Sequence, residues 1–239
     1  MNVPFVTFVT RRDEQTLDPD SFPGCLPFAS DLHLEFDSPV TFFVGENGSG
    51  KSTLLEAMAV LARLPISGGS QNELDAKFAF EEQSELANAL RMAFIRQPKD
   101  RFFFRAETQA QFASHLDDVG ALRYGTKSLH HMSHGEAFLA IMNHRFEHGL
   151  FLMDEPESAL SPQRQLTLLA LMHKLVRSGQ SQFFVATHSP ILLTYPGATI
   201  ISFDFGPLER MKLEETSHYQ ITRDLLNNPE MYWRHLAAE

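Results

Sequence analysis

The residues best suited to chemistry form a glycine-rich loop that ends in a lysine and two hydroxyl side chains. The loop fits the pattern G-x-x-x-x-G-K-[S/T] of a phosphate-binding P-loop, and its members are Gly45, Glu46, Asn47, Gly48, Ser49, Gly50, Lys51, Ser52 and Thr53. Its glycines permit tight turns, so successive backbone N–H groups can converge on anionic oxygens. Lys51 would reach the β- and γ-phosphates of a nucleotide, and the Ser52 hydroxyl would ligate Mg²⁺.

A pair of acidic residues, Asp154 and Glu155, directly follows the apolar run at residues 150–153. A carboxylate at the end of a parallel strand beside a P-loop is placed to hold Mg²⁺, and we assign that role to Asp154. The Glu155 side chain diverges from its neighbour and can meet the water that attacks the γ-phosphate, as a general base or a water-orienting group. The alternative interpretation is an ordinary acidic turn after a strand, and the P-loop makes that alternative less favoured.

A histidine, His188, follows another apolar run at residues 183–186. An imidazole there could touch the γ-phosphate and the attacking water. A lone histidine after a strand is more often structural, but this one ends the strand that comes after the acidic one. That position favours a catalytic role.

Ser133 and Glu136 have the spacing of a capping box, in which the two side chains satisfy the first backbone N–H groups of a helix. A cap without a ligand is one interpretation of this segment. The other is a second helix N-terminus, including Gly135, that is offered to a phosphate.

The pattern of apolar runs predicts the elements that position these residues. Buried strands are predicted at residues 39–44, 102–105, 150–153, 183–186 and 199–203, and helices at 54–62 and 162–177. Strands that alternate with helices predict an α/β fold with a mostly parallel sheet. Elsewhere the sequence predicts strands at 3–10 and 32–36, a polar helix over 72–92, and two short C-terminal helices split at Pro229. That C-terminal piece would pack on the sheet edge or bind a partner.

The charge and cysteine content narrow the partners and the compartment. The chain of 239 residues has a net charge of −10, which argues against a broadly basic nucleic-acid surface without excluding a local basic groove. Its one cysteine, Cys25, cannot form an internal disulfide. No apolar run approaches a membrane span, and the first residues do not open a signal peptide. We expect a cytoplasmic protein.

The order of the motifs GENGSGKST, SHGEAF, LFLMDEP and ATHSP resembles that of the ABC-type ATPases, which include transporter ATP-binding subunits and SMC-like repair ATPases. Within them it is similar to small bacterial ATPases of the AAA/ABC-like type. Ser133, Gly135 and Glu136 look like a variant of the family's signature motif. The resemblance implies one ABC-type ATPase domain over residues 1–239, with ATP and Mg²⁺ as cofactors. It also implies an antiparallel N-terminal β portion and a small helical insert with the signature region at about 68–146.

The resemblance also implies how the site works. Lys51, Glu155 and His188 would be catalytic in ATP hydrolysis, and a further Mg²⁺ contact would follow an edge strand, at Glu107 by position or at Gln97 by chemistry. Two copies would form a head-to-tail homodimer, with each ATP between the P-loop of one copy and residues 133–136 of the other.

The output of such an ATP-driven dimerisation switch would be on an unknown protein or nucleic-acid partner. Two alternatives remain from the same family: the ATP-binding subunit of a membrane transporter, and a DNA-repair or defence-associated ATPase. A binding module without hydrolysis is disfavoured by the complete set of Lys51, Ser52, Asp154, Glu155 and His188.

Overall fold

The computed structural model describes residues 5–69, 84–106, 139, 142–143, 148–204 and 206–237. Its larger sheet has the strand order β5 (Arg101–Arg105), β6 (Gly149–Asp154), β7 (Ser181–Ala186), β3 (Val40–Val44), β8 (Thr199–Ser202) and β9 (Glu209–Met211). All neighbouring pairs are parallel except β8 and β9. The predicted mostly parallel α/β sheet is therefore confirmed.

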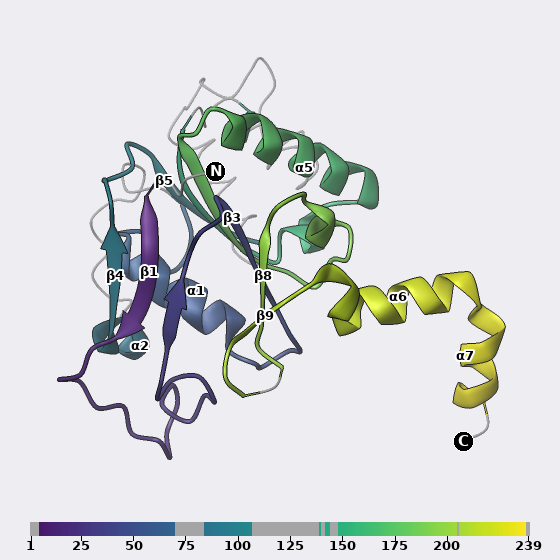
Figure 1. Ribbon diagram of the computed structural model, residues 1–239, viewed down its shortest axis with the longest axis horizontal. Helices are drawn as coiled ribbons and strands as arrows, with labels where there is room; N and C mark the ends of the chain where they lie inside the picture. Colours follow the sequence, from purple (N-terminus) through teal and green to yellow (C-terminus); the bar gives the residue numbers. More distant parts are fainter. Residues whose placement is uncertain are drawn as a thin grey trace.

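The central strands are apolar throughout because both faces of this sheet are covered. Alternate residues point to opposite faces, so Phe183 and Val185 join one buried cluster while Phe184 joins the other. Helix α1 (Lys51–Leu61) packs in the cluster that holds Phe184. Helix α5 (Pro162–Arg177) packs in the cluster on the other face and crosses the top of the sheet in Figure 1.

A second, antiparallel sheet has the order β2 (His33–Glu35), β1 (Val6–Arg11) and β4 (Leu90–Phe94). It shares the buried cluster of α1, and β1 and β4 lie side by side in Figure 1. One buried side chain joins the two sheets: Gln182 of β7 accepts a hydrogen bond from the Val6 N–H at 2.8 Å and donates one to the Val6 carbonyl at 2.9 Å. The expected antiparallel N-terminal portion is thus present.

The helix predicted over residues 72–92 is wrong at its C-terminal end. Helix α2 (Glu85–Ala89) stops at Ala89, and Leu90 begins β4; residues 70–83 lie outside the described part of the chain. Pairing with β1 and the complete burial of Leu90 override the local helix preference of the polar sequence. The interval assigned to a helical insert, 68–146, therefore contains β4 and β5 as well.

The remaining elements follow the ends of the parallel strands. Short 3-10 helices form at Pro156–Ala159 (η3), Leu192–Thr194 (η4) and Leu213–Glu215 (η5). Helices α6 (Ser217–Asn227) and α7 (Pro229–Leu236) form a C-terminal arm that extends away from the sheet in Figure 1. The split at Pro229 is as predicted, but packing is limited to the start of the arm, where Thr216 is buried, because no residue of α6 is buried.

We expect Gln182→Leu to lower the free energy of unfolding by about 2–4 kcal/mol, because it leaves the buried N–H and carbonyl of Val6 without partners. Urea unfolding followed by circular dichroism measures this change. The exposed Gln180, two residues away, supplies the matched control, and Gln180→Ala should shift stability by less than about 0.5 kcal/mol. Equal stabilities of the two variants would contradict the role of Gln182 in joining the sheets.

Candidate nucleotide-binding site

The strand order brings the predicted site residues to one edge of the larger sheet. Strands β6, β7 and β3 are neighbours and run parallel, so their carboxyl ends open on the same side. Asp154 ends β6, His188 lies two residues beyond β7, and the P-loop (residues 45–53) follows β3. A parallel sheet binds ligands at this edge, beside a strand whose neighbours come from distant parts of the sequence.

The P-loop has the backbone that its glycines predict. Gly48 and Gly50 have φ of 81° and 96°, in the left-handed region. A Cβ at Gly50 would also lie 2.7 Å from Phe28 Cε1, so a side chain is excluded twice over. Helix α1 starts at the next residue and directs its N-terminus at the loop.

The Lys51 ammonium is folded into the loop. Its Nζ donates to the carbonyls of Gly45 and Glu46 at 2.7 and 2.9 Å, and the side chain is 4% exposed. Burial lowers the pKa of Lys51 below its usual value, against the opposing charges of Glu155 and Asp154. The cation therefore lies where phosphate oxygens could replace the two carbonyls.

Ser52 and Asp154 meet across the site, as their predicted shared role requires. The Ser52 hydroxyl donates to Asp154 Oδ1 at 2.9 Å. Burial raises the pKa of Asp154 to about 6, although the Ser52 hydrogen bond and the Arg105 charge oppose the shift. Arg105 lies 3.9 Å from Asp154 Oδ2 and pairs with Glu56 Oε1 at 2.7 Å.

Glu155 adopts a backbone conformation that residues other than glycine rarely take, with φ of 47°. Hydrogen bonds hold it there: its N–H donates to the Ala186 carbonyl, and its carbonyl accepts from Ser158. Such strain is kept where the surrounding structure enforces it, often at functional sites. The turn separates the Glu155 side chain from Asp154 and places Glu155 Oε1 3.5 Å from His188 Nε2.

The loop that carries His188 is anchored by an acid that the sequence analysis did not select. Glu157 Oε1 accepts a hydrogen bond from the His188 backbone N–H at 2.6 Å, and burial raises the pKa of this carboxyl. Burial is the largest cause that lowers the pKa of the His188 imidazole, and the positive charge of Lys51 is the second. These effects favour the neutral form of the imidazole.

The arrangement suits phosphate and a hard cation. Ser49 Oγ and His188 Nε2 are buried and have no hydrogen-bond partner within the described ranges. Both can donate to anionic oxygens. The described residues contain no cluster of three or more histidine, cysteine, aspartate or glutamate side chains that could hold a metal alone. One hydroxyl and one carboxylate instead fit Mg²⁺, which takes few protein ligands and completes its shell with phosphate and water.

Some predicted residues are not placed with this group. Ser133, Gly135, Glu136 and Glu107 lie outside the described residues. Gln97 precedes β5, at the amino ends of the parallel strands and away from the P-loop edge, where its Oε1 accepts a hydrogen bond from Arg101. This position removes Gln97 from the candidate Mg²⁺ ligands.

Sequence reasoning missed side chains that also end parallel strands. Arg105 ends β5 level with Asp154, and Asp204 follows β8 and accepts a hydrogen bond from the Glu46 N–H at 2.7 Å. The rule that selected Asp154, a polar side chain at the carboxyl end of a parallel strand, would have found both. His218, which contacts His188, has no such signal because it lies in α6.

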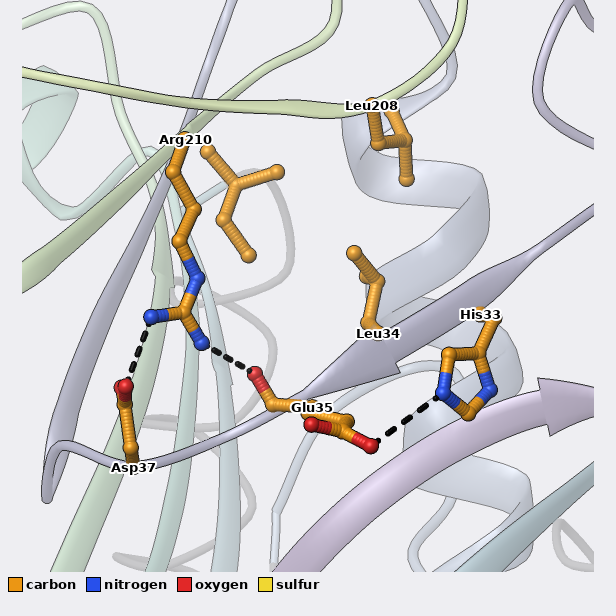
Figure 2. Close-up of a pocket in the computed structure, with 7 residues that line it drawn as sticks. His33, Leu34, Glu35, Asp37, Leu208 and Arg210 are labelled. Carbon is orange, nitrogen blue, oxygen red and sulfur yellow. Dashed lines mark hydrogen bonds and ion pairs between the residues drawn. The ribbon is translucent and has the colours of Figure 1, made fainter.

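A cavity of about 510 Å³ lies elsewhere, and Figure 2 shows the side chains that line it. Its charged groups satisfy one another: Arg210 binds Asp37 at 2.6 Å and the Glu35 carbonyl at 2.9 Å, and His33 lies 3.4 Å from Glu35 Oε1. Asp37 precedes β3, whereas the P-loop follows it. This cavity is therefore separate from the candidate site.

Comparisons with known proteins agree with the fold and the motifs. One family model, described as "AAA domain", matches residues 22–114, and a second, "AAA domain, putative AbiEii toxin, Type IV TA system", matches residues 121–194. A "Putative ABC transporter ATP-binding protein" of Geobacter sulfurreducens is 28% identical over 61% of this chain and 58% of its own length. The cobalt import ATP-binding protein CbiO of Salmonella paratyphi A is 25% identical over 68% of this chain and 66% of its own length. The matches thus span less than two thirds of either relative.

A solved structure has the same fold. The structure of cbiO1 from Clostridium perfringens, part of the ABC transporter complex cbiONQ, gives a TM-score of 0.53 at 15% identity, over 98% of this chain and 100% of that one. The site defines a P-loop nucleotide-binding protein. The matched models, the relatives and the fold together show that the chain is similar to ABC-type ATP-binding proteins. Within the ranges that the structure covers, no helix has the length and hydropathy to cross a membrane.

The raised pKa of Asp154 predicts that Asp154→Asn stabilises the nucleotide-free protein. An acid whose pKa is higher folded than unfolded binds more protons when folded, so stability falls as pH rises from about 4 to about 6. Above about pH 6 the buried charge persists, and the neutral amide should raise the free energy of unfolding by about 1–3 kcal/mol.

Urea unfolding of wild type and Asp154→Asn at pH 4 and pH 8 checks this expectation. The difference between the two proteins should appear at pH 8 and shrink at pH 4. The exposed Asp13 gives a control, since Asp13→Asn should change little at either pH. A less stable Asp154→Asn protein at pH 8 would contradict the assigned cost of the buried carboxylate.

Proposed function

We propose that this protein binds ATP with Mg²⁺, hydrolyses it, and acts as an ATP-driven dimerisation switch. The observation that carries the proposal is the meeting of three adjacent strand ends. They bring Lys51, the Ser52–Asp154 pair at 2.9 Å and the Glu155–His188 pair at 3.5 Å to one P-loop.

The P-loop residues have distinct roles in binding. The P-loop backbone and the N-terminus of α1 would surround the β-phosphate. The N–H donors would come from Gly45, Asn47, Gly48, Ser49, Gly50 and Thr53, and from Glu46 once its N–H exchanges Asp204 Oδ1 for a phosphate oxygen. Lys51 would exchange its two carbonyl partners for phosphate oxygens. Ser52 and Asp154 would hold Mg²⁺, with Glu107 as a further contact. When bound, the ion neutralises charge on the phosphate oxygens.

Two further side chains would act on the water that attacks the γ-phosphate. Glu155 is half-exposed beside the P-loop edge, so its carboxylate can orient that water or accept its proton. His188 Nε2 is buried without a hydrogen-bond partner in the described ranges and can donate to the γ-phosphate. The backbone N–H of Glu155 donates to the Ala186 carbonyl, and that of His188 donates to Glu157 Oε1. Both side chains are therefore held in place, and a fixed position of the reacting groups favours catalysis.

The proposed dimer follows from the open side of the P-loop. A single P-loop leaves the γ-phosphate half exposed, and a second helix N-terminus would cover it. Ser133, Gly135 and Glu136 of a second copy would supply that N-terminus in a head-to-tail homodimer. Hydrolysis would then remove charge that holds the copies together. We further propose that residues 1–239 act as one domain in the cytoplasm, on a protein partner of unknown identity.

A transporter ATP-binding subunit is the second candidate, because the relatives named above are described as ABC transporter and cobalt import ATP-binding proteins. The two candidates differ in what activates turnover. A dimerisation switch hydrolyses ATP alone, and turnover per subunit rises with its concentration. A transporter subunit needs a membrane protein for full activity. ATP turnover per subunit, measured against protein concentration, separates the two candidates. The same measurement with and without DNA tests whether nucleic acid contributes.

Glu155→Gln should lower ATP turnover at least about a hundredfold while ATP binding is retained, because the amide cannot accept a proton. The stalled protein should accumulate as a dimer with ATP, which light scattering after size exclusion measures. Lys51→Ala is the control, since it should lose ATP binding and remain a monomer. If wild type and Glu155→Gln both bind ATP and neither turns it over, the protein is not an ATPase.

A mixing experiment tests whether each site is shared between copies. Lys51→Ala and Ser133→Arg should each be inactive alone, because one lacks the P-loop cation and the other blocks the opposite helix N-terminus. In an equal mixture, each mixed dimer joins the intact P-loop of one variant to the intact Ser133 of the other, so part of the wild-type turnover should return, at no more than half per dimer. A site built within one chain gives no recovery, and that result would overturn the shared-site geometry.

A further inference from the structure

The first turn of the C-terminal arm reaches the candidate site. His218, in α6, places its Nε2 2.9 Å from His188 Nδ1, with ring centroids 5.0 Å apart and planes inclined by 53°. Among the described residues, this is the one hydrogen bond that the imidazole ring of His188 makes. On its other side, the same ring presents Nε2 to Glu155 Oε1 at 3.5 Å.

We propose that His218 is a positioning residue that fixes His188 as the tautomer with its proton on Nε2. The inference rests on the proposed function, because that proton would serve the γ-phosphate or the attacking water. His218 itself lies behind His188 and would act only through it.

The direction of the hydrogen bond decides the tautomer. Two neutral imidazoles share a hydrogen bond only if one ring donates and the other accepts. If His188 donated from Nδ1, its Nε2 would turn a lone pair toward the Glu155 carboxylate, and the two acceptors would repel. If His218 donates, His188 accepts at Nδ1 and keeps its proton on Nε2, directed at the carboxylate.

The same direction continues behind His218. When His218 donates from Nε2, its Nδ1 carries a lone pair and needs a donor. The Ser217 hydroxyl lies 3.4 Å from that atom and can provide one. From Ser217 to His188 each group then has the donor or acceptor that its neighbour requires, and the Nε2 proton of His188 lies near the Glu155 carboxylate, 3.5 Å away, without a hydrogen bond to it. The reverse direction would set a lone pair against that carboxylate.

The arm is anchored where it makes this contact. Thr216, which is 1% exposed, caps α6 by accepting from the Tyr219 N–H at 3.4 Å and donates to the Leu213 carbonyl at 2.8 Å. His218 is therefore held by a capped first turn, although the rest of α6 has no buried residue. A fixed His218 can hold His188, whose backbone is fixed separately by Glu157.

Nuclear magnetic resonance of histidine labelled with ¹⁵N tests the tautomer without ATP, so its result is independent of hydrolysis. In the full-length wild type, we expect the His188 signals, assigned by their loss in His188→Ala, to report a proton on Nε2. In His218→Leu they should show a mixture of the two tautomers. A wild-type signal with the proton on Nδ1 would overturn the proposal even if turnover is normal.

Kinetics then separates positioning from folding. His218→Leu should lower kcat for ATP about tenfold with KM nearly unchanged, and His218→Gln, which keeps an N–H donor, should recover most of it. Adding His218→Leu to His188→Ala should cause no further loss. His173→Leu, at an exposed histidine away from the P-loop edge, is the matched control.

If His218→Leu lowers kcat as much in His188→Ala as it does in wild type, His218 has a structural role and the proposal is overturned. Failure of Gln to recover kcat while the protein remains folded would do the same. If wild type has no turnover at all, the proposed function fails, and the resonance experiment still decides the tautomer.

Discussion

The register between three parallel strands is the constraint on which the site depends. Ala186 of β7 is level with Asp154 of β6 on one side and with Phe43 of β3 on the other. The chain therefore leaves the sheet at nearly the same height in all three places. Glu155 turns through its hydrogen bond to the Ala186 carbonyl, and the Thr187 N–H donates to the Phe43 carbonyl. A slip of one residue would turn Asp154 to the opposite face of the sheet.

The charges around the P-loop are mostly negative, which matches a site that works with Mg²⁺. Asp154, Glu155, Asp204 and Glu46 all act on the pKa of Lys51. Without ligand, carbonyl oxygens and these carboxylates stabilise the lysine. A triphosphate would bring further negative charge, so ATP alone would be disfavoured and a divalent cation would restore the balance. The negative charge at this site is therefore compatible with phosphate binding, provided that a divalent cation would accompany the triphosphate.

The parts of the site that the sequence predicts are those encoded by contiguous residues. The P-loop and Asp154–Glu155 each combine an apolar strand with the polar residues that follow it, so both the element and its edge are visible in the sequence. The position of Gln97 needed the sheet topology, because β4 joins the antiparallel sheet while β5 pairs with β6. Leu90 was assigned to a helix for the same reason, since its pairing with β1 lies far away in sequence. His218 reaches His188 only through the placement of α6, which no local pattern encodes.

The site also explains why the surrounding core must be so thoroughly packed. A charged Asp154 with its pKa raised to about 6 costs about 3 kcal/mol of stability at neutral pH. The left-handed backbone of Glu155 adds about 1–3 kcal/mol. Together these costs are comparable to a large part of the net stability of a typical domain. The phenylalanines of β3 and β7 offset them by filling both faces of the sheet behind the strained edge. A ligand that neutralised the buried charge of Asp154 would raise stability, so occupancy and stability would be coupled.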